Sequence, residues 1–207
     1  IKQKNALLKR VYETGKNSDL IDVYNIKQAK TGAKIIKERA VFTEQINKKA
    51  GHNHFDIANR AEELEIKYSC DIPDYSGEES DFYKSLDKIK DKEIKIQSTI
   101  IGPHRDDIEI LLNGLNIRDY GSQGQQRSAI LSLKFAEMQI IKEKTNKQPV
   151  LLLDDALSEL DLLRKRKLLN KIDTKQTFIT CTEKRRYMTL DDSISFFFVN
   201  KGSVKSI

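Results

Sequence analysis

The chain of 207 residues is poor in the residues that build covalent or metal-based frameworks: it has two cysteines, three histidines, three prolines and no tryptophan. Cys70 and Cys181 lie far apart and match no metal-ligand spacing. We therefore expect no disulfide framework and place the protein in a reducing cytoplasm. His52 and His54 have no cysteine nearby, so we interpret this pair as a feature of a loop rather than as a metal site.

Three kinds of segment are also missing. No stretch approaches the roughly eighteen apolar residues that a transmembrane helix needs, and no amino-terminal segment has the order of a signal peptide. Nor is there a Gly-x-x-x-x-Gly-Lys-Ser/Thr motif, the P-loop that holds nucleotide phosphates. Strong nucleotide binding by this chain alone therefore has little basis. Because the chain opens on Ile1 in a helical pattern, we expect it to be part of a longer polypeptide.

Charge is abundant and unevenly distributed. Charged residues make up 33% of the chain, and the net charge is +6. The first fifty residues contain twelve lysines and arginines against five acidic residues, a net charge of +7, so the remainder has a net charge of −1. Such asymmetry indicates contact with a polyanion. A solvated, lysine-rich helix face explains the composition equally well.

The first half of the sequence predicts a helical arm. A helical pattern over residues 1–14 is ended by Gly15, and Ser18 is suited to cap a second helix. Apolar residues keep helical spacing as far as Ala50, and Gly51 is expected to end this helix. Two consecutive amphipathic helices favour an antiparallel hairpin.

After the arm the hydrophobic period changes. Leu64, Ile66 and Tyr68 alternate with polar residues, which predicts a half-buried strand. A loop over residues 71–80 and a short helix over residues 81–90 are expected to follow.

The second half alternates strands and helices, as is typical of an α/β layer. Asn113-Gly114 between two apolar runs predicts a β-hairpin, and the wholly apolar Val150–Leu153 predicts a strand buried on both faces. We expect strands at 99–101, 108–112, 115–117, 150–153 and 177–180 (the last also buried), helices at 124–144 and 161–171, and a closing hairpin of 194–199 with 203–206.

Two carboxylates follow the apolar strand. Asp154 and Asp155 stand at its carboxyl end, where open α/β sheets bind their ligands. One carboxylate can hold Mg²⁺ while the next polarises an attacking water. Apolar strands that end in aspartate also occur for purely structural reasons, so the pair alone does not decide between a site and a strand end.

A loop rich in glycine and serine, Gly121-Ser122-Gln123-Gly124-Gln125, leads into the long helix. Ser122 is placed to cap that helix, and the glycines would let backbone N–H groups approach an anion. A simple helix-start turn would have the same composition. Downstream of the carboxylates comes Ser158-Glu159-Leu160-Asp161, with Asp161 placed to begin the next helix.

Together these segments resemble the head of ABC-type ATPases. The loop at 121–125 looks like the signature motif, residues 151–155 like Walker B, and residues 158–161 like the D-loop. The interval of 32 residues from Ser122 to Asp154 suits the SMC-like and repair branch. Within that branch the chain resembles the RecF family of recombination-repair ATPases, which has these motifs and a stretch similar to Ile101–Asp107 in the same order.

The resemblance implies an α/β fold, the carboxyl-terminal part of an ABC-type ATPase head of the P-loop NTPase class. We expect a helical arm and second lobe over residues 1–97 and the head over 98–207. The P-loop of the family lies nearer the amino terminus, so this chain would be a carboxyl-terminal fragment without it. Thr180-Cys181-Thr182 stands where ABC proteins normally offer a histidine, so no γ-phosphate sensor is assigned there.

The resemblance also implies roles for individual residues around ATP and Mg²⁺. Asp154 would help to hold Mg²⁺, and Asp155 would occupy the position of the catalytic base. The signature residues Ser122, Gly124 and Gln125 would contact the γ-phosphate of ATP held by a second subunit, and the D-loop residues Ser158 and Asp161 would lie at the dimer interface.

The implied function is binding to single-stranded or gapped DNA, controlled by ATP-dependent homodimerisation, in cooperation with RecO and RecR to load the RecA recombinase. Weak ATP hydrolysis is expected of the full-length dimer and none of this chain alone. The expected location is the cytoplasm, in association with the nucleoid. For DNA contact we nominate Lys30, Lys34 and Lys37.

Two alternatives stay open. One is another SMC-like head, such as an overcoming-lysogenization-type nuclease or a chromosome-organising protein. The other is a non-catalytic DNA-binding scaffold that keeps the motifs as packing features.

Overall fold

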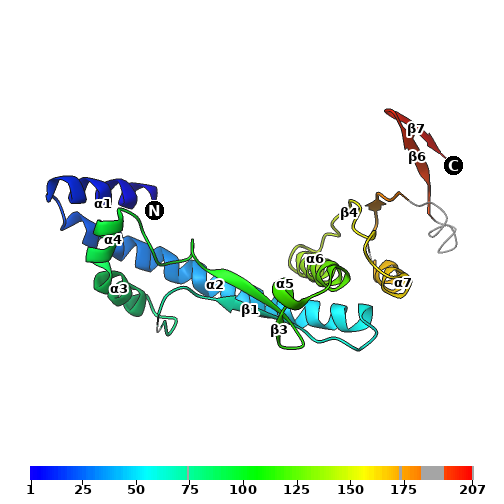
Figure 1. Ribbon diagram of the computed structural model, residues 1–207, viewed down its shortest axis with the longest axis horizontal. Helices are drawn as coiled ribbons and strands as arrows, with labels where there is room; N and C mark the ends of the chain where they lie inside the picture. Colours follow the sequence, from blue (N-terminus) through cyan, green and yellow to red (C-terminus); the bar gives the residue numbers. More distant parts are fainter. Residues whose placement is uncertain (74, 173, 183–193, 207) are drawn as a thin grey trace.

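A computed structural model describes residues 1–73, 75–172, 174–182 and 194–206 (Figure 1). The molecule is elongated along helix α2 (Leu20–Ile57), with the amino terminus near one end and the carboxyl-terminal hairpin near the other. We call the end formed by α1, the first half of α2, α3 and α4 the arm end. The end formed by α6, β4, β5 and α7 is the head end.

Helix α1 (Lys2–Thr14) ends as predicted. Gly15 adopts a left-handed conformation with φ of +68°, and its N–H donates to the carbonyl of Val11. Such a turn favours glycine because it has no Cβ to clash with the backbone. The chain then reverses into α2 through a short connection.

Helix α2 corrects the sequence prediction at both ends. Its N-cap is Asp19 rather than Ser18, and it continues through Gly51 for a total of 38 residues, roughly 57 Å. A Cβ at Gly51 would lie 3.2 Å from the carbonyl oxygen of Leu64, so the glycine gives a strand room to approach the helix instead of ending it. His52 and His54 therefore lie in a helix, not in the predicted loop.

A three-stranded antiparallel sheet lies along α2. Strand β1 (Leu64–Ser69) pairs with β2 (Asp107–Leu112), and β2 pairs with β3 (Leu115–Asn116). The predicted hairpin turn is confirmed, because Asn113 and Gly114 both have positive φ, as a tight two-residue turn requires. The β1–β2 ladder joins the segments before and after residue 97, and a domain boundary there remains a prediction.

The arm end contains α3 (Glu79–Lys88), close to the predicted helix, and α4 (Lys90–Ile96), which the sequence pattern did not suggest. The strand expected at residues 99–101 is absent. Instead, Ile101 is buried in a cluster with Phe82 and Leu86. Side chains satisfy the backbone there: Gln28 donates to the carbonyl of Ile101, and Asn5 accepts from the N–H of Thr99. These backbone groups therefore do not need a neighbouring strand as their hydrogen-bond partner.

A short helix, α5 (Ile117–Tyr120), leads into the head end, which begins with the long helix α6 (Gln123–Thr145). Strand β4 (Leu151–Leu153) pairs in parallel with β5 (Thr177–Ile179), and α7 (Leu162–Asn170) lies between them in sequence.

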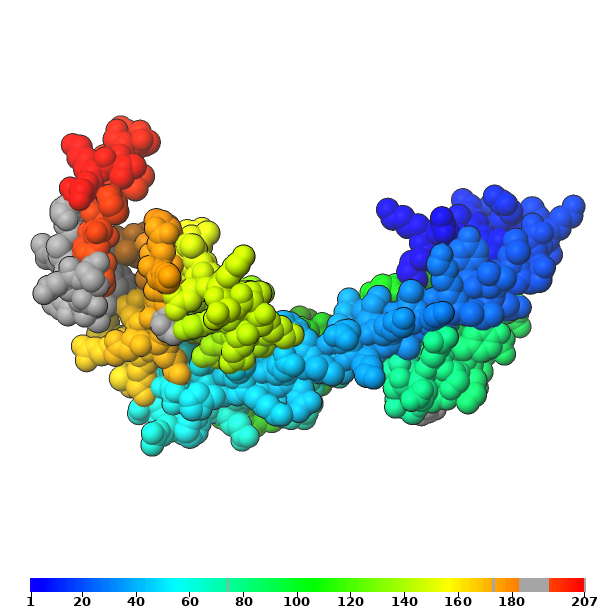
Figure 2. Space-filling view, turned by 180° about the vertical axis from the view of Figure 1, so that it is seen from behind, coloured from blue at the N-terminus to red at the C-terminus, as the bar shows by residue number. Residues whose placement is uncertain are grey.

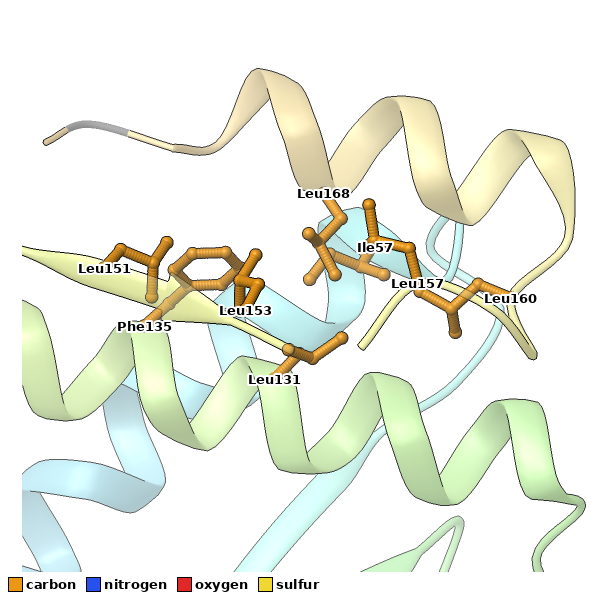
Figure 3. Close-up of a cluster of buried hydrophobic side chains, with 8 residues drawn as sticks. All are labelled: Ile57, Leu131, Phe135, Leu151, Leu153, Leu157, Leu160 and Leu168. Carbon is orange, nitrogen blue, oxygen red and sulfur yellow. The ribbon is translucent and has the colours of Figure 1, made fainter. Parts of the chain in front are cut away.

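Apolar side chains from α2, α6, β4, the 155–161 loop and α7 meet in one core at the head end (Figure 3). Its buried members are Ile57, Leu131, Phe135, Leu151, Leu153, Leu157, Leu160 and Leu168.

Strand β4 is covered on one face only, so the prediction of burial on both faces is wrong for this chain. Leu151 and Leu153 point into the core, whereas Leu152 between them is 70% exposed. In β5, Phe178 is likewise exposed rather than buried.

The closing hairpin is confirmed as β6 (Phe197–Asn200) with β7 (Ser203–Ser206), joined through Lys201 and Gly202. Its residues are exposed. Among the described residues, no helix is long and apolar enough to cross a membrane.

Candidate functional site

The loop before α6 is built as a helix cap, as the sequence predicts. Ser122 is the N-cap: its hydroxyl accepts a hydrogen bond from the N–H of Gln125 (3.3 Å), and the side-chain oxygen of Gln125 accepts from the N–H of Ser122 (2.9 Å). In a helix the first N–H groups have no intrahelical acceptor, so those of Gln123 and Gly124 remain suited to an anion. Ser122 and Gln123 are exposed.

The glycines of this loop allow close packing. A Cβ at Gly121 would lie 2.6 Å from the carbonyl oxygen of Ile117, which is too close for any side chain. A Cβ at Gly124 would lie 3.3 Å from the carbonyl oxygen of Glu159. The start of α6 thus packs directly against the 158–161 segment, and both glycines have a steric reason to be there.

The carboxylate pair follows β4 and is held by β5. The hydroxyl of Thr180 donates to Oδ1 of Asp154 (2.5 Å) and accepts from the N–H of Asp155 (2.9 Å). Asp155 adopts a left-handed backbone conformation with φ of +45°, and both carboxylates are exposed. Thr180 therefore fixes the direction of the strand end, a role that the sequence did not indicate.

The described residues contain no group of three or more His, Cys, Asp or Glu placed to hold a metal ion. A Mg²⁺ ion needs no such group, because it is usually bound through one or two carboxylates, water and the phosphates of the substrate. Asp154 fits that kind of site, since Thr180 engages one of its oxygens and the side chain is open to solvent.

The segment at 158–161 forms a tight turn after the carboxylates. The hydroxyl of Ser158 donates to the carbonyl of Asp155 (3.0 Å), and Leu157 and Leu160 anchor the turn in the core. Asp161 caps α7 by accepting from the N–H of Arg164 (2.9 Å), which confirms that it begins a helix. Ser158 and Asp161 are both exposed.

An ion pair ties α6 to this turn near the surface. Nε of Arg127 lies 2.7 Å from a carboxylate oxygen of Glu159, and Nη1 of Arg127 donates to the carbonyl of Asp155 (3.3 Å). The hydrogen bond from Arg127 holds the pKa of Glu159 below its usual range, so the pair is charged at neutral pH. The head end therefore brings together six of the predicted site residues: Ser122, Gly124, Asp154, Asp155, Ser158 and Asp161.

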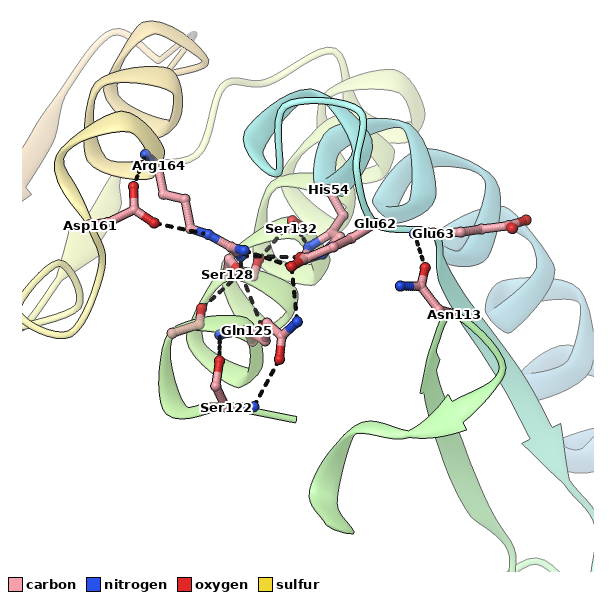
Figure 4. A network of polar contacts seen from close by, with 11 residues as sticks. His54, Glu62, Glu63, Asn113, Ser122, Gln125, Ser128, Ser132, Asp161 and Arg164 are labelled. Atoms are coloured by element: carbon pink, nitrogen blue, oxygen red, sulfur yellow. Dashed lines mark hydrogen bonds and ion pairs between the residues drawn. The ribbon is translucent and has the colours of Figure 1, made fainter. Parts of the chain in front are cut away.

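Behind this surface lies a buried polar network that sequence reasoning missed (Figure 4). Glu62, in the connection between α2 and β1, accepts hydrogen bonds from Gln125, Arg164 and His54. Because Glu62 and Arg164 are 102 positions apart, no local pattern could have paired them. In this network only Gln125 could have been recognised from a local pattern, because it lies three residues after the N-cap Ser122 and completes a capping box.

Burial shapes the charge states of the network. Burial alone would raise the pKa of Glu62, but hydrogen bonds from Arg164 and Gln125 outweigh it and hold that pKa below its usual range. Burial lowers the pKa of His54, and its contact with Glu62 only partly opposes this. The network is therefore an ionised carboxylate beside a guanidinium and a neutral imidazole.

The lysines nominated for DNA contact lie elsewhere. Lys30, Lys34 and Lys37 are exposed on the first half of α2, at the arm end. Figure 2 shows this blue part of the molecule far from the yellow and orange head end. On α2 and the loop beside it, Lys27, Arg39 and His104 line a hollow of about 340 Å³.

The stretch Ile101–Asp107 also lies near the arm end. Asp106 accepts hydrogen bonds from the hydroxyl of Tyr68 and from the N–H of Asp71 (3.0 Å). Arg39 of α2 donates to the carbonyl of Pro103. The stretch therefore fastens β2 to β1 and α2, and it does not join the residues of the head end.

Comparison with solved structures identifies the class. The chain superposes over its full length on two structures of the recombination mediator protein RecF of the RecFOR pathway, one with ATP (TM-score 0.82) and one described as RecF-ATPrS (TM-score 0.80). Sequence identity is 38% in both cases, and the match covers 55% of each of those chains. The fold is that of the carboxyl-terminal part of an ABC-type ATPase head.

Comparison with curated proteins finds RecF proteins of several bacteria. The chain is 39% identical over 203 residues to the DNA replication and repair protein RecF of Ruminiclostridium cellulolyticum. It is 43% identical over 190 residues to that of Clostridium perfringens and 41% over 210 residues to that of Clostridium botulinum. The chain is similar to these RecF proteins over almost its whole length. No protein-family model matches it.

The extent of these matches matters for function. The alignments cover 91–100% of this chain but only 53–57% of the three relatives. The chain thus spans about half the length of the curated relatives that it matches.

Proposed function

We propose that the chain acts as the carboxyl-terminal half of a RecF protein, which binds single-stranded or gapped DNA under the control of ATP-dependent dimerisation. In this proposal the protein works with RecO and RecR to load the RecA recombinase in the cytoplasm, at the nucleoid. The observation that supports it is the junction at the head end, where the signature-like loop packs on the turn that follows the carboxylate pair.

The proposed ATP site is shared between two subunits. The P-loop of one subunit holds ATP, while Ser122 and the N–H groups around Gly124 of the other approach the γ-phosphate. Asp154 helps to hold Mg²⁺, Asp155 activates water, and Ser158 and Asp161 lie at the dimer interface. Aspartate at the position of the base is one methylene shorter than glutamate, which fits slow hydrolysis. ATP then serves as a switch that joins two heads.

Dimerisation of the full-length protein tests this proposal. ATP should shift the mass measured by light scattering from monomer to dimer, and Ser122→Arg should abolish the shift because the larger cation-bearing side chain fills the phosphate position. Ser18→Arg, an exposed serine at the arm end, is the matched control. A scaffold that merely keeps the motifs as packing features would ignore ATP.

The chain alone should not turn over ATP, because the P-loop motif is missing from its sequence. Robust hydrolysis by the purified chain, removed by Asp155→Asn, would overturn this part of the proposal.

We further propose that Lys30, Lys34 and Lys37 contact DNA phosphates, because they share an exposed face of α2 at the basic end of the chain. Neutralising all three should weaken binding and reduce its salt dependence, by a slope of roughly 0.7 to 0.9 for each lost contact. The same change at Lys88, Lys92 and Lys95, exposed lysines at the same end, is the control. Equal losses in both triple variants would mean that only net charge matters.

A further inference from the structure

Both polar atoms of the Gln125 side chain form hydrogen bonds within the chain. Its oxygen accepts from the N–H of Ser122 (2.9 Å), and its nitrogen donates to Oε1 of Glu62 (2.9 Å). The two partners fix the orientation of the amide, because a flipped amide would set oxygen against carboxylate and NH₂ against N–H. In Figure 4 the side chain points toward Glu62, behind the loop. Gln125 is half-buried, whereas Ser122 and Gln123 are exposed.

Glu62 is the point at which three segments meet. Its side chain is 10% exposed. Oε1 accepts from Gln125 and from Nη2 of Arg164 (2.7 Å), and Oε2 accepts from Nη1 of Arg164 (3.2 Å) and contacts Nε2 of His54 (3.0 Å). A carboxylate with this many donors stays ionised and holds each donor in one direction.

Arg164 extends the link to the helix after the turn. Its side chain is 17% exposed, its Nη1 donates to the hydroxyl of Ser128 on α6 (2.7 Å), and its Nε lies 3.3 Å from a carboxylate oxygen of Asp161. Ser128 donates in turn to the carbonyl of Gly124 (2.8 Å). The connection after α2, the start of α6 and the start of α7 are therefore held as one unit.

We propose that Glu62 and Arg164 are positioning residues for the signature-like loop, and that Gln125 acts through them as an internal brace rather than as a ligand of the nucleotide. The phosphate-facing groups of the loop are then the Ser122 hydroxyl and the N–H groups that begin α6. This inference rests on the proposed function and replaces the γ-phosphate contact that the family resemblance implied for Gln125.

A double-mutant cycle in the full-length protein tests the assignment. The measured quantity is the ATP concentration at half-maximal dimerisation for Gln125→Ala, for Glu62→Gln and for the double variant. A brace predicts that each single change raises this concentration by about tenfold and that the double change adds little, because both break the same link. If Gln125 instead contacts the nucleotide, the effects of the two single changes should multiply. The double variant would then need about a hundredfold more ATP for half-maximal dimerisation, and that result would overturn the proposal.

Matched controls separate positioning from loss of fold. Gln139→Ala removes the same type of side chain from the same helix, at a contact with Asn53 of α2, and should leave the ATP dependence unchanged. Arg164→Lys tests the second positioning residue: it keeps the charge but loses the two-pronged contact with Glu62, and it should weaken dimerisation like Glu62→Gln. An Arg164→Lys variant that dimerises like wild type would remove Arg164 from the proposal.

Amide exchange without nucleotide distinguishes a failure of this inference from a failure of the proposed function. Gln125→Ala and Glu62→Gln should each speed hydrogen exchange at the N–H of Ser122, whether or not the protein dimerises. Unchanged exchange in both variants would show that the brace does not hold the loop. Absence of ATP-dependent dimerisation in the wild type would instead refute the proposed function and leave the exchange result standing.

Discussion

The two ends of the molecule bury their residues in different ways. At the arm end even charges are enclosed: Lys4 is 1% exposed, Glu93 is 0% exposed, and their charged groups lie 2.6 Å apart. At the head end Leu152, in the middle of a wholly apolar strand, is 70% exposed. The arm end covers its polar and apolar interior with its own helices. The head end leaves both its candidate site residues and one face of its sheet open.

The difference shows that a wholly apolar strand sequence does not ensure that the described residues bury both faces of that strand. A parallel strand normally reads as a continuous apolar run because elements cover both faces of its sheet. Here α6 and α7 contribute to the core on one face of β4 only. Four changes test this comparison, from the largest expected effect to the smallest.

Breaking the enclosed ion pair at the arm end should cost the most. Glu93→Ala leaves the ammonium of Lys4 buried without its carboxylate, and we expect a loss of about 3–5 kcal/mol in the free energy of unfolding, measured with urea. Lys48→Ala, which breaks an exposed pair with Glu44, should cost far less, because solvent screens that pair. Equal losses for the two variants would mean that the arm end is not closed.

Two neighbours on β4 give the sharpest contrast within the head end. Leu153→Ala empties a core position and should cost about 2–5 kcal/mol, whereas Leu152→Ala should change the unfolding free energy by less than about 0.5 kcal/mol. Denaturant unfolding of this chain measures both. A large loss from Leu152→Ala would show that its face is covered after all.

The turn after the carboxylates depends on a helix cap. Asp161→Ala removes the acceptor for the N–H of Arg164, and we expect a loss of about 1 kcal/mol in the free energy of unfolding. Asp91 lies in the first turn of α4, where no side chain caps the helix, so Asp91→Ala is the control and should cost less. The cap prediction fails if the two alanine variants melt at the same temperature.

The buried histidine should make stability depend on pH. Burial lowers the pKa of His54 in the folded chain, so below about pH 6.5 the unfolded chain binds the proton first. The unfolding free energy should therefore fall as pH drops from about 6.5 toward the lower, folded pKa.

Matched glutamine variants isolate that effect. His54→Gln should flatten the dependence, because glutamine stays neutral over this range. His52→Gln, at an exposed site on the same helix, should leave it unchanged. An unaltered slope in His54→Gln would assign the pH dependence to other groups.

Local signals predicted local structure well. A turn or a cap is decided by a few neighbouring residues, so these features were predicted correctly. They are the helix end at Gly15, the turn at Asn113-Gly114 and the caps at Ser122 and Asp161. The prediction for Gly51 was wrong because the reason for this glycine is tertiary: a Cβ there would crowd the carbonyl oxygen of Leu64 in β1, at 3.2 Å.

Long-range contacts could not be predicted from local patterns. The apolar triplet at 99–101 looked like a strand, but side chains from α1 and α2 satisfy its backbone groups. In the candidate site, Ser122, Asp154 and Asp161 were predicted from their motifs. Glu62 was not predicted and Thr180 was given no role, because their partners lie 63 and 26 positions away.

The central claim is that this chain supplies its signature-like loop to ATP held by another subunit. A mixing experiment tests it directly, with full-length Ser122→Arg protein and full-length protein whose P-loop lysine is replaced by alanine. Each variant alone should lack ATP hydrolysis. Mixed dimers contain one site with an intact P-loop and an intact Ser122, so the account predicts that mixing restores turnover. If the mixture stays as inactive as its components, Ser122 does not act across the subunit boundary.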